Sequence, residues 1–254
     1  MRPFDIQNNG YAGVDFCDAD ITAESLHHAC CELEKDGCQS ILVTMISDTV
    51  ENMVGKLKHL VALRGADDVA ERVIRGFHLE GPFLSTEAGY RGAHPQEVMI
   101  SADVDITKRM IDTCDGLLRL VTLAPECDPD FATTRYLDGQ GIVVSAGHCN
   151  PSLDQLKGAI GAGLKMVTHF GNACPVNLSR HDNVLQRYLH FREHLWFCFI
   201  PDGAHVDFYA LRNYIDLVGV ERSIIVTDAI AAAKMPPGKY TLSGFEVEVD
   251  SAGV

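Results

Sequence analysis

Four short hydrophobic runs of this sequence end at a residue that can bind a metal ion or transfer a proton. The runs end at Glu80 in FHLEGPF, His148 in VVSAGH, His169 in MVTHFGNA and Asp228 in IIVTDA. In each run, residues rich in Val, Ile, Leu and Phe come first, and Gly, Asn or Ala follows where the chain would turn. Parallel strands deliver their last residues to one face of a sheet, where α/β enzymes hold their active sites. The pattern therefore predicts one site assembled from many strands.

Eight strand-like runs can be marked along the chain, and most are apolar on both faces, as buried parallel strands are. They cover residues 3–8, 40–46, 74–80, 117–126, 141–148, 165–172, 195–203 and 223–229. Apolar residues at helical spacing predict helices between them, over residues 22–33, 50–63, 103–114, 152–162 and 208–218. About eight repeats of strand and helix favour an α/β fold of the (β/α)8 TIM-like barrel type over an open doubly wound sheet. No Gly-rich dinucleotide loop or phosphate loop follows any strand, which also argues against the open sheet.

The sequence changes character after Asp228. Two prolines and a glycine lead into alternating residues at 240–242 and 245–249, which predict an antiparallel hairpin. We therefore expect a barrel over residues 1–235 and the beginning of a truncated β-rich accessory segment over residues 236–254. Because the first strand starts within three residues of Met1 and the hairpin stops at Val254, we expect the chain to be an excerpt of a longer one.

Composition excludes several classes of protein. The formal net charge of −14, without basic clusters, argues against a nucleic-acid or anionic-membrane partner. No apolar run approaches the roughly 18 residues that a membrane span needs, and no secretory signal is visible. The nine cysteines are odd in number and include no C-x-x-C pair, which is typical of free thiols in a reducing cytoplasm. Cys149 and Cys174 adjoin the predicted site and could be soft metal ligands, although packing is the simpler interpretation.

Hydrolytic metal sites bind zinc and related ions through His nitrogens and carboxylate oxygens, and they leave one position for water. Glu80, His148 and His169 supply such a ligand set. A single histidine at a strand end is more often structural. The joint appearance of three ligand groups with the unpaired Asp228 favours a catalytic site.

The motifs HLEGPF, SAGH, THFGNA, DGAHV (202–206) and TDA (227–229), in this order, resemble the N-acetylglucosamine-6-phosphate deacetylase family of the amidohydrolase superfamily. The resemblance runs from about Asp5 to Tyr240. It implies a metal-dependent hydrolase of amino sugar metabolism that converts N-acetylglucosamine 6-phosphate into glucosamine 6-phosphate and acetate. It also implies that the hairpin is the start of a small β-sandwich.

The resemblance carries over residue by residue. It implies metal binding by Glu80, His148 and His169, general base and acid catalysis by Asp228, and a contact of His94 in RGAHPQE with the substrate carbonyl. The residues that it places at the sugar, its phosphate or the substrate in general are Asn172, Ala173, Arg180, His205 and Gln7.

The sequence departs from the wider superfamily on the first strand. Where many amidohydrolases carry a His-x-His pair for a second metal, Gln7 and Asn9 stand here, and neutral amides bind divalent transition metals weakly. The resemblance therefore implies one divalent ion, with zinc as the first choice and iron, cobalt or manganese as alternatives. It further implies a cytoplasmic homo-oligomer, a dimer, whose partner molecule is a small amino-sugar phosphate.

Two other functions stay open from the sequence. The same barrel and metal could serve a cyclic amide such as dihydroorotate or a hydantoin. Alternatively, a barrel with truncated ends could bind an amino-sugar phosphate without catalysis.

Overall fold

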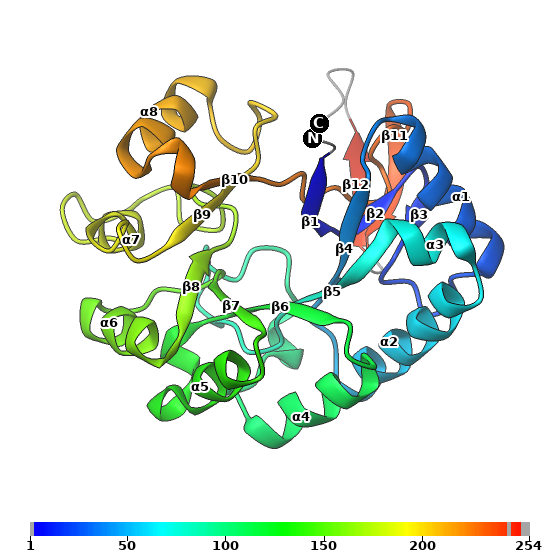
Figure 1. The fold of residues 1–254 in the computed structure, drawn as a ribbon. Helices are drawn as coiled ribbons and strands as arrows, with labels where there is room; N and C mark the ends of the chain where they lie inside the picture. The colour runs from blue at the N-terminus through cyan, green and yellow to red at the C-terminus, as the bar shows by residue number, and fades with distance from the viewer. Residues whose placement is uncertain (1–2, 243–244, 250–254) are drawn as a thin grey trace.

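The computed structural model of the protein describes residues 3–242 and 245–249, and its main feature is one sheet of eight parallel strands (Figure 1). The strands follow one another around the sheet in chain order. They are β1 (Phe4–Asn8), β4 (Ser40–Ile46), β5 (Ile74–Glu80), β6 (Leu118–Leu123), β7 (Val143–Ala146), β8 (Leu164–Val167), β9 (Trp196–Phe199) and β10 (Ser223–Ile225).

The sheet curls into a nearly closed barrel because the segment after β10 returns to β1. The backbone N–H of Asn9 donates to the carbonyl of Ala229 at 2.7 Å, and the N–H of Asp228 donates to the carbonyl of Gln7 at 3.0 Å. These bonds join the end of β1 to the segment that follows β10, and so connect the two edges of the sheet. The predicted (β/α)8 TIM-like barrel is confirmed.

Helices surround the barrel on the outside (Figure 1). All five predicted helices are present, as α1 (Ala23–Lys35), α2 (Val50–Gly65), α4 (Val104–Thr113), α6 (Leu153–Ala162) and α8 (Phe208–Val218). Three short helices were not predicted, namely α3 (Asp68–Val73), α5 (Ala132–Gly139) and α7 (Val184–His190). Single 3-10 turns cover Gln96–Val98, Pro125–Cys127, Pro129–Phe131 and Val220–Arg222. No helix in the described ranges is both long and apolar enough to cross a membrane.

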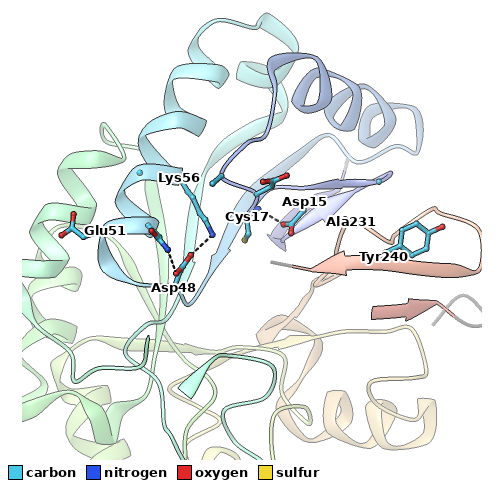
Figure 2. Close-up of a pocket in the computed structure, with 12 residues that line it drawn as sticks. Asp15, Cys17, Asp48, Glu51, Lys56, Ala231 and Tyr240 are labelled. Atoms are coloured by element: carbon cyan, nitrogen blue, oxygen red, sulfur yellow. Dashed lines mark hydrogen bonds and ion pairs between the residues drawn. The ribbon is translucent and has the colours of Figure 1, made fainter. Parts of the chain in front are cut away.

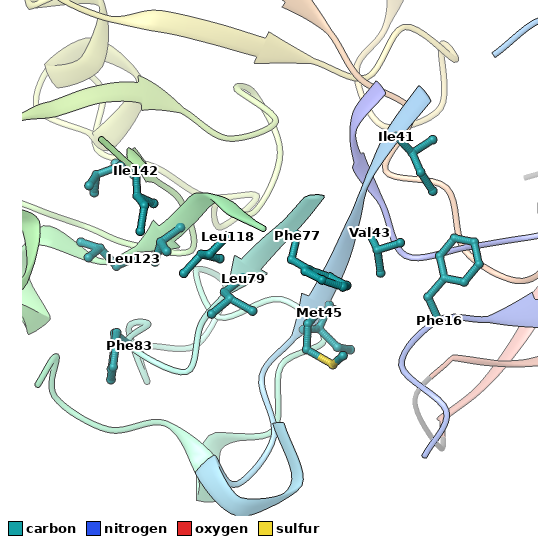
Figure 3. Packing of buried hydrophobic residues seen from close by; sticks show 14 of the residues in the cluster. Phe16, Ile41, Val43, Met45, Phe77, Leu79, Phe83, Leu118, Leu123 and Ile142 are labelled. Atoms are coloured by element: carbon teal, nitrogen blue, oxygen red, sulfur yellow. The ribbon is translucent and has the colours of Figure 1, made fainter. Parts of the chain in front are cut away.

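Apolar side chains fill two separate spaces. The larger cluster lies between the sheet and the helices, where Phe77 and Leu79 of β5 pack with Val43 and Met45 of β4 (Figure 3). The smaller cluster lies inside the barrel, because its members alternate along the strands with members of the larger one, as Leu42 does with Ile41 and Val43. Its buried members are Leu42, Leu120, Met166, Cys198, Ile200 and Val226. Successive residues of one strand therefore face alternately the helices and the barrel interior.

Several strands are shorter than predicted. The predicted runs 117–126, 141–148, 165–172 and 195–203 end two to five residues later than the observed strands, and the chain turns before it reaches the site residues. His148 and His169 have φ values of 50° and 30°, in the left-handed region that cannot continue a strand.

Two antiparallel hairpins complete the fold. One joins β2 (Gly10–Tyr11) to β3 (Val14–Asp15), and the other joins β11 (Gly238–Leu242) to β12 (Phe245–Val249). The second hairpin confirms the structure predicted for the end of the sequence. The division of the chain at residue 235 into a barrel and an accessory segment stays a prediction.

Candidate active site

Four of the predicted site residues stand at the carboxyl ends of four barrel strands. Glu80 is the last residue of β5, and His148 and His169 follow β7 and β8 by two residues each. Asp228 follows β10 by three residues. Because all eight strands are parallel, these side chains share one end of the barrel, as the strand-end pattern predicted.

Glu80, His148 and His169 form a tight, buried cluster in which one ligand atom of each lies within 4.8 Å of the others. The Oε1 atom of Glu80 is 3.0 Å from Nε2 of His169 and 3.2 Å from Nε2 of His148. The two Nε2 atoms are 3.1 Å apart. No other cluster of three such residues occurs within residues 3–242 and 245–249.

The geometry of this cluster fits a divalent metal ion. Ligand atoms around a tetrahedral zinc ion, with bonds of about 2.0–2.2 Å, lie roughly 3.3–3.6 Å apart, slightly more than the 3.0–3.2 Å seen here. The Nδ1 atom of His148 is 3.0 Å from the carbonyl of Tyr90, so Nδ1 carries the proton and the lone pair of Nε2 points into the cluster. Three electron-pair donors therefore converge on one point.

The carboxylate and the imidazoles of the cluster stabilise each other's charged forms. Burial alone would raise the pKa of Glu80, but the hydrogen bonds and charges of His148 and His169 hold it well below its usual range. Burial would likewise lower the pKa of His169, but the hydrogen bond and charge of Glu80 raise it above its usual value. Nδ1 of His169 is buried without a hydrogen-bond partner. Glu80 is therefore a carboxylate at neutral pH, the form that binds cations.

Strained backbone is concentrated in this site. His148, His169 and Asp228 have φ values of 50°, 30° and 51°, and each such residue costs of order 1–3 kcal/mol. Gly92, with φ of 58°, lies so close to the ring of His148 that a Cβ atom there would be 2.9 Å from its Cε1. The loop after β5 therefore closes directly over a metal-ligand candidate.

His94 is the second residue of that loop to reach the site, and it is only 5% exposed. Its ring centroid lies 4.3 Å from that of His148, and its Nε2 lies 4.0 Å from Oε2 of Glu80. Burial, with the nearby His148, lowers the pKa of His94 to about 3, so its ring is neutral. The N–H of Ser47 donates to its Nδ1 at 3.4 Å, and the Ser47 hydroxyl lies 2.9 Å from the same atom. Since Nδ1 accepts, Nε2 carries the proton and can donate into the site.

Asp228 and Glu80 each receive a hydrogen bond from an amide of the first strand region. Nδ2 of Asn9 donates to Oδ1 of Asp228 at 2.7 Å, and Nε2 of Gln7 donates to Oε1 of Glu80 at 3.3 Å. Burial and the negative charge of Glu80 raise the pKa of Asp228 above its usual value. The two amides thus present N–H groups to the carboxylates.

The predicted substrate residues lie at different distances from the cluster. Asn172 and Ala173 line a small hollow of about 20 Å³ together with His148 and His169. Arg180 and His205 are exposed in the loops after β8 and β9, and within the described part of the chain neither bonds to the cluster. The His205 ring is paired with Asp202 at 2.5 Å. The structure therefore groups Gln7, Asn172 and Ala173 with the cluster, whereas Arg180 and His205 remain at the surface.

A larger hollow of about 890 Å³ lies beside α2 and the second hairpin (Figure 2). Asp15, Asp48 and Glu51 line it with Lys56, which is paired with Asp48 at 2.8 Å. None of the predicted site residues contributes to it. Its acidic lining is unsuited to an anionic substrate, so this hollow is not the substrate site.

Ser47 and Tyr90 were missed by the sequence analysis. Ser47 directly follows β4, and the strand-end pattern that identified Glu80 could have found it. Tyr90 acts through its backbone carbonyl, which every residue possesses, so the sequence carries no signal for it.

Comparisons with known proteins find deacetylases of amino-sugar phosphates. The chain is 32% identical over 253 residues to N-acetylglucosamine-6-phosphate deacetylase of Bos taurus, covering 97% of this chain and 61% of that protein. It is 29% identical to N-acetylgalactosamine-6-phosphate deacetylase of Escherichia coli O157:H7, over 96% of this chain and 63% of that protein. No protein-family model matches the sequence.

Solved structures give the same result. A mutant of N-acetyl-D-glucosamine-6-phosphate deacetylase from Mycobacterium smegmatis, in complex with N-acetyl-D-glucosamine-6-phosphate, superposes with a TM-score of 0.88 and 29% identity. The match covers 98% of this chain and 63% of that one. The resemblance predicted from the motifs is confirmed, and the chain spans about three fifths of the length of these relatives.

Proposed function

We propose that this chain, as a relative of the N-acetylglucosamine-6-phosphate deacetylases, hydrolyses the acetamide of N-acetylglucosamine 6-phosphate to glucosamine 6-phosphate and acetate. The observation that carries the proposal is the convergence of Glu80, His148 and His169 beside a neutral His94. The similarity to named deacetylases favours this reaction over hydrolysis of a cyclic amide and over binding without catalysis.

The three-residue cluster would hold one divalent cation, with zinc as the first choice and iron, cobalt or manganese as alternatives. Such an ion supplies Lewis acidity, which acidifies water and polarises a carbonyl group. Gln7 and Asn9 support a single ion, because their amides donate to Glu80 and Asp228 instead of offering imidazoles.

Asp228 would act as the general base and then as the general acid. Its Oδ1 is occupied by the amide of Asn9, which leaves Oδ2 to take a proton from the attacking water. The protonated carboxyl would then donate to the amine nitrogen, which is otherwise too basic to leave. The raised pKa of Asp228 suits a group that must both take and return a proton.

His94 would stabilise the negative charge that develops on the acetyl oxygen. Its Nδ1 is fixed by Ser47, so Nε2–H is the donor that faces the site. A hydrogen bond of this kind, aimed at the charge of the transition state, is worth about 10²–10³-fold in turnover.

The phosphate would be bound by Arg180 and His205, with Asn172 and Ala173 against the sugar. A chain of net charge −14 repels a dianion unless a local cation outweighs the general field. Both residues lie in loops that follow barrel strands, on the same end of the barrel as the cluster. We further propose a cytoplasmic, dimeric enzyme.

The test is metal analysis combined with an acetate-release assay on the 254-residue chain. We expect about one tightly bound ion per chain and acetate release from N-acetylglucosamine 6-phosphate, with N-acetylgalactosamine 6-phosphate and dihydroorotate as comparison substrates. Bound metal without acetate release from either amino-sugar phosphate would refute the deacetylase. Substrate binding without metal would instead make the chain a non-catalytic barrel.

A further inference from the structure

Five polar side chains form a continuous hydrogen-bonded chain inside the barrel, and we call it the polar belt: Thr44, His78, Thr122, Thr168 and Ser145. His78 lies at its centre, with Nδ1 3.2 Å from the hydroxyl of Thr44 and Nε2 2.8 Å from that of Thr122. The Thr122 hydroxyl is 2.7 Å from that of Thr168, which is 2.6 Å from that of Ser145. The belt thus crosses from β4 to the end of β8.

The polar belt lies directly beneath the candidate metal ligands. His78 precedes Glu80 by two residues on β5, so both side chains face the barrel interior. Thr168 immediately precedes His169, and Ser145 lies three residues before His148. Below the belt, the next inward residues are those of the apolar interior cluster, such as Leu42, Leu120 and Met166. Each of the three ligand-bearing segments therefore carries one belt residue.

Burial of the polar belt carries a cost in folding free energy that apolar side chains in the same space would not. All five residues are 4% exposed or less, and a buried polar group is unfavourable unless it is hydrogen-bonded. Valine in place of threonine, or leucine in place of histidine, would fill a similar volume without that requirement. Apolar contacts have no preferred direction, whereas a hydrogen bond between two side chains fixes their distance and angle and so the relative position of their strands.

At the level of the belt, backbone hydrogen bonds do not fully fix the positions of neighbouring strands. The register between β5 and β6 shifts between Phe77 and His78, and the register between β7 and β8 shifts between Val144 and Ser145. At these shifts the ladder of backbone hydrogen bonds is interrupted. The side-chain bond between His78 and Thr122 connects β5 with β6, and that between Ser145 and Thr168 connects β7 with the end of β8, at the same two interruptions. The bond between Thr122 and Thr168 passes across β7 and links these two pairs of strands.

We propose that the polar belt, with His78 as its central positioning residue, fixes the positions of β5, β7 and β8 relative to one another along the barrel axis. It thereby holds the ligand atoms of Glu80, His148 and His169 at the spacing that a metal ion requires. The inference rests on the metal site of the proposed function. A neutral imidazole donates at one nitrogen and accepts at the other, so His78 can link a hydroxyl on each side of β5.

Three belt variants test the proposal: Thr122→Val, Thr168→Val and His78→Leu. The measurement is the affinity of the 254-residue chain for Zn²⁺ by chelator competition, together with the visible absorption bands of bound Co²⁺, which report coordination geometry. We expect each variant to bind Zn²⁺ about ten- to a hundredfold more weakly, the range for residues that orient metal ligands, and to change the Co²⁺ bands. His78→Asn, which keeps a polar group near the Nδ1 position, should recover part of the affinity.

The matched control is Thr133→Val on α5. Thr133 is 1% exposed, and its hydroxyl has no hydrogen-bond partner, so the same substitution there should leave Zn²⁺ affinity and the Co²⁺ bands unchanged. Belt variants that bind Zn²⁺ within twofold of the unaltered chain, with unchanged bands, would overturn the proposal even if they unfold at lower temperature. If His78→Leu does not fold, the two threonine variants decide. An unaltered chain that binds neither ion would refute the metal site itself, and the role of the belt with it.

Discussion

At the scale of single residues, Asp228 differs from Glu80 in its contacts with imidazoles: both carboxylates receive a hydrogen bond from an amide, but only that of Glu80 also lies against two histidine rings. Asn9 donates to Oδ1 of Asp228 at 2.7 Å, whereas Glu80 lies between two histidines. This difference separates a group that moves protons from a group that binds metal.

We predict that Asp228→Asn keeps the metal and loses turnover. The amide has nearly the same shape but can neither accept the proton of water nor donate one to the amine, and a general acid-base group contributes about 10²–10⁴-fold. The measurements are kcat from acetate release and metal content per chain. Asp105→Asn on the exposed surface of α4 serves as the control and should change neither. Loss of metal in proportion to activity would instead identify Asp228 as a ligand.

Arg180 gives the second prediction at this scale. It is exposed and forms no ion pair within the described part of the chain, so its charge is available to a phosphate. A hydrogen bond to a charged group is worth about 1.5–3 kcal/mol, so Arg180→Ala should lower kcat/KM for N-acetylglucosamine 6-phosphate by about ten- to a hundredfold. Unphosphorylated N-acetylglucosamine should be affected little.

The control for this prediction is Arg212→Ala on α8, which removes another exposed arginine. It should leave kcat/KM for both sugars unchanged. If Arg180→Ala impairs both substrates equally, Arg180 supports the loop and does not bind phosphate.

At the scale of elements, the loop from Gly81 to Pro95 shows how a connection shapes the site. At Gly92 its backbone leaves no room for a Cβ atom beside the ring of His148, and its carbonyl at Tyr90 fixes the proton on that ring. Its His94 supplies the donor for the acetyl oxygen. One loop thus positions a ligand and contributes a reacting group.

We predict that Gly92→Ala weakens metal binding. The new Cβ would lie 2.9 Å from Cε1 of His148, so the imidazole must move. Gly116→Ala is the matched control, because Gly116 also has a positive φ, of 72°, but open space around it. Both variants should lose about 1–2 kcal/mol of stability from the left-handed backbone, measured by urea unfolding. Only Gly92→Ala should lower Zn²⁺ affinity; equal affinities in the two variants would contradict the role of the loop.

The sequence predicted some elements and not others for physical reasons. Long helices such as α2 and α8 repeat their apolar residues over three or more turns, which gives a clear period. The helices α3, α5 and α7 have six to eight residues, too few for a period to appear. The strand-end pattern identified Glu80, His148, His169 and Asp228. Contacts made by backbone atoms, such as the carbonyl of Tyr90, do not depend on residue type, so the sequence cannot indicate them.

At the scale of the whole molecule, the barrel closes through a buried carboxylate. Asp5 of β1 accepts from the hydroxyl of Thr227 at 2.5 Å and from its backbone N–H at 3.2 Å. It also accepts from the N–H of Gln7 and the amide of Asn8, both at 3.2 Å. The first strand and the segment after the last strand are therefore joined at one side chain, only 6% exposed.

Because Thr227 immediately precedes Asp228, closure of the barrel and placement of the general base depend on the same contact. Removal of Asp5 leaves the buried N–H of Gln7 and the buried side-chain amide of Asn8 without this acceptor, and each such loss costs about 1–3 kcal/mol before relaxation. It also removes two hydrogen bonds from Thr227, which is exposed. We predict that Asp5→Ala lowers the free energy of unfolding by about 2–4 kcal/mol and also lowers kcat. Urea unfolding and acetate release on the same preparation measure the two effects.

A double-mutant cycle with Thr227→Val separates this contact from a general loss of packing. Residues that share a hydrogen bond couple by about 0.5–3 kcal/mol, so the two substitutions together should cost less than the sum of their separate effects on unfolding. Thr133→Val, whose hydroxyl has no partner, should be additive with Asp5→Ala. Additivity of both pairs would mean that backbone bonds, such as those from Asn9 to Ala229 and from Asp228 to Gln7, hold the edges of the sheet without help from Asp5, and that the position of Asp228 does not depend on Asp5.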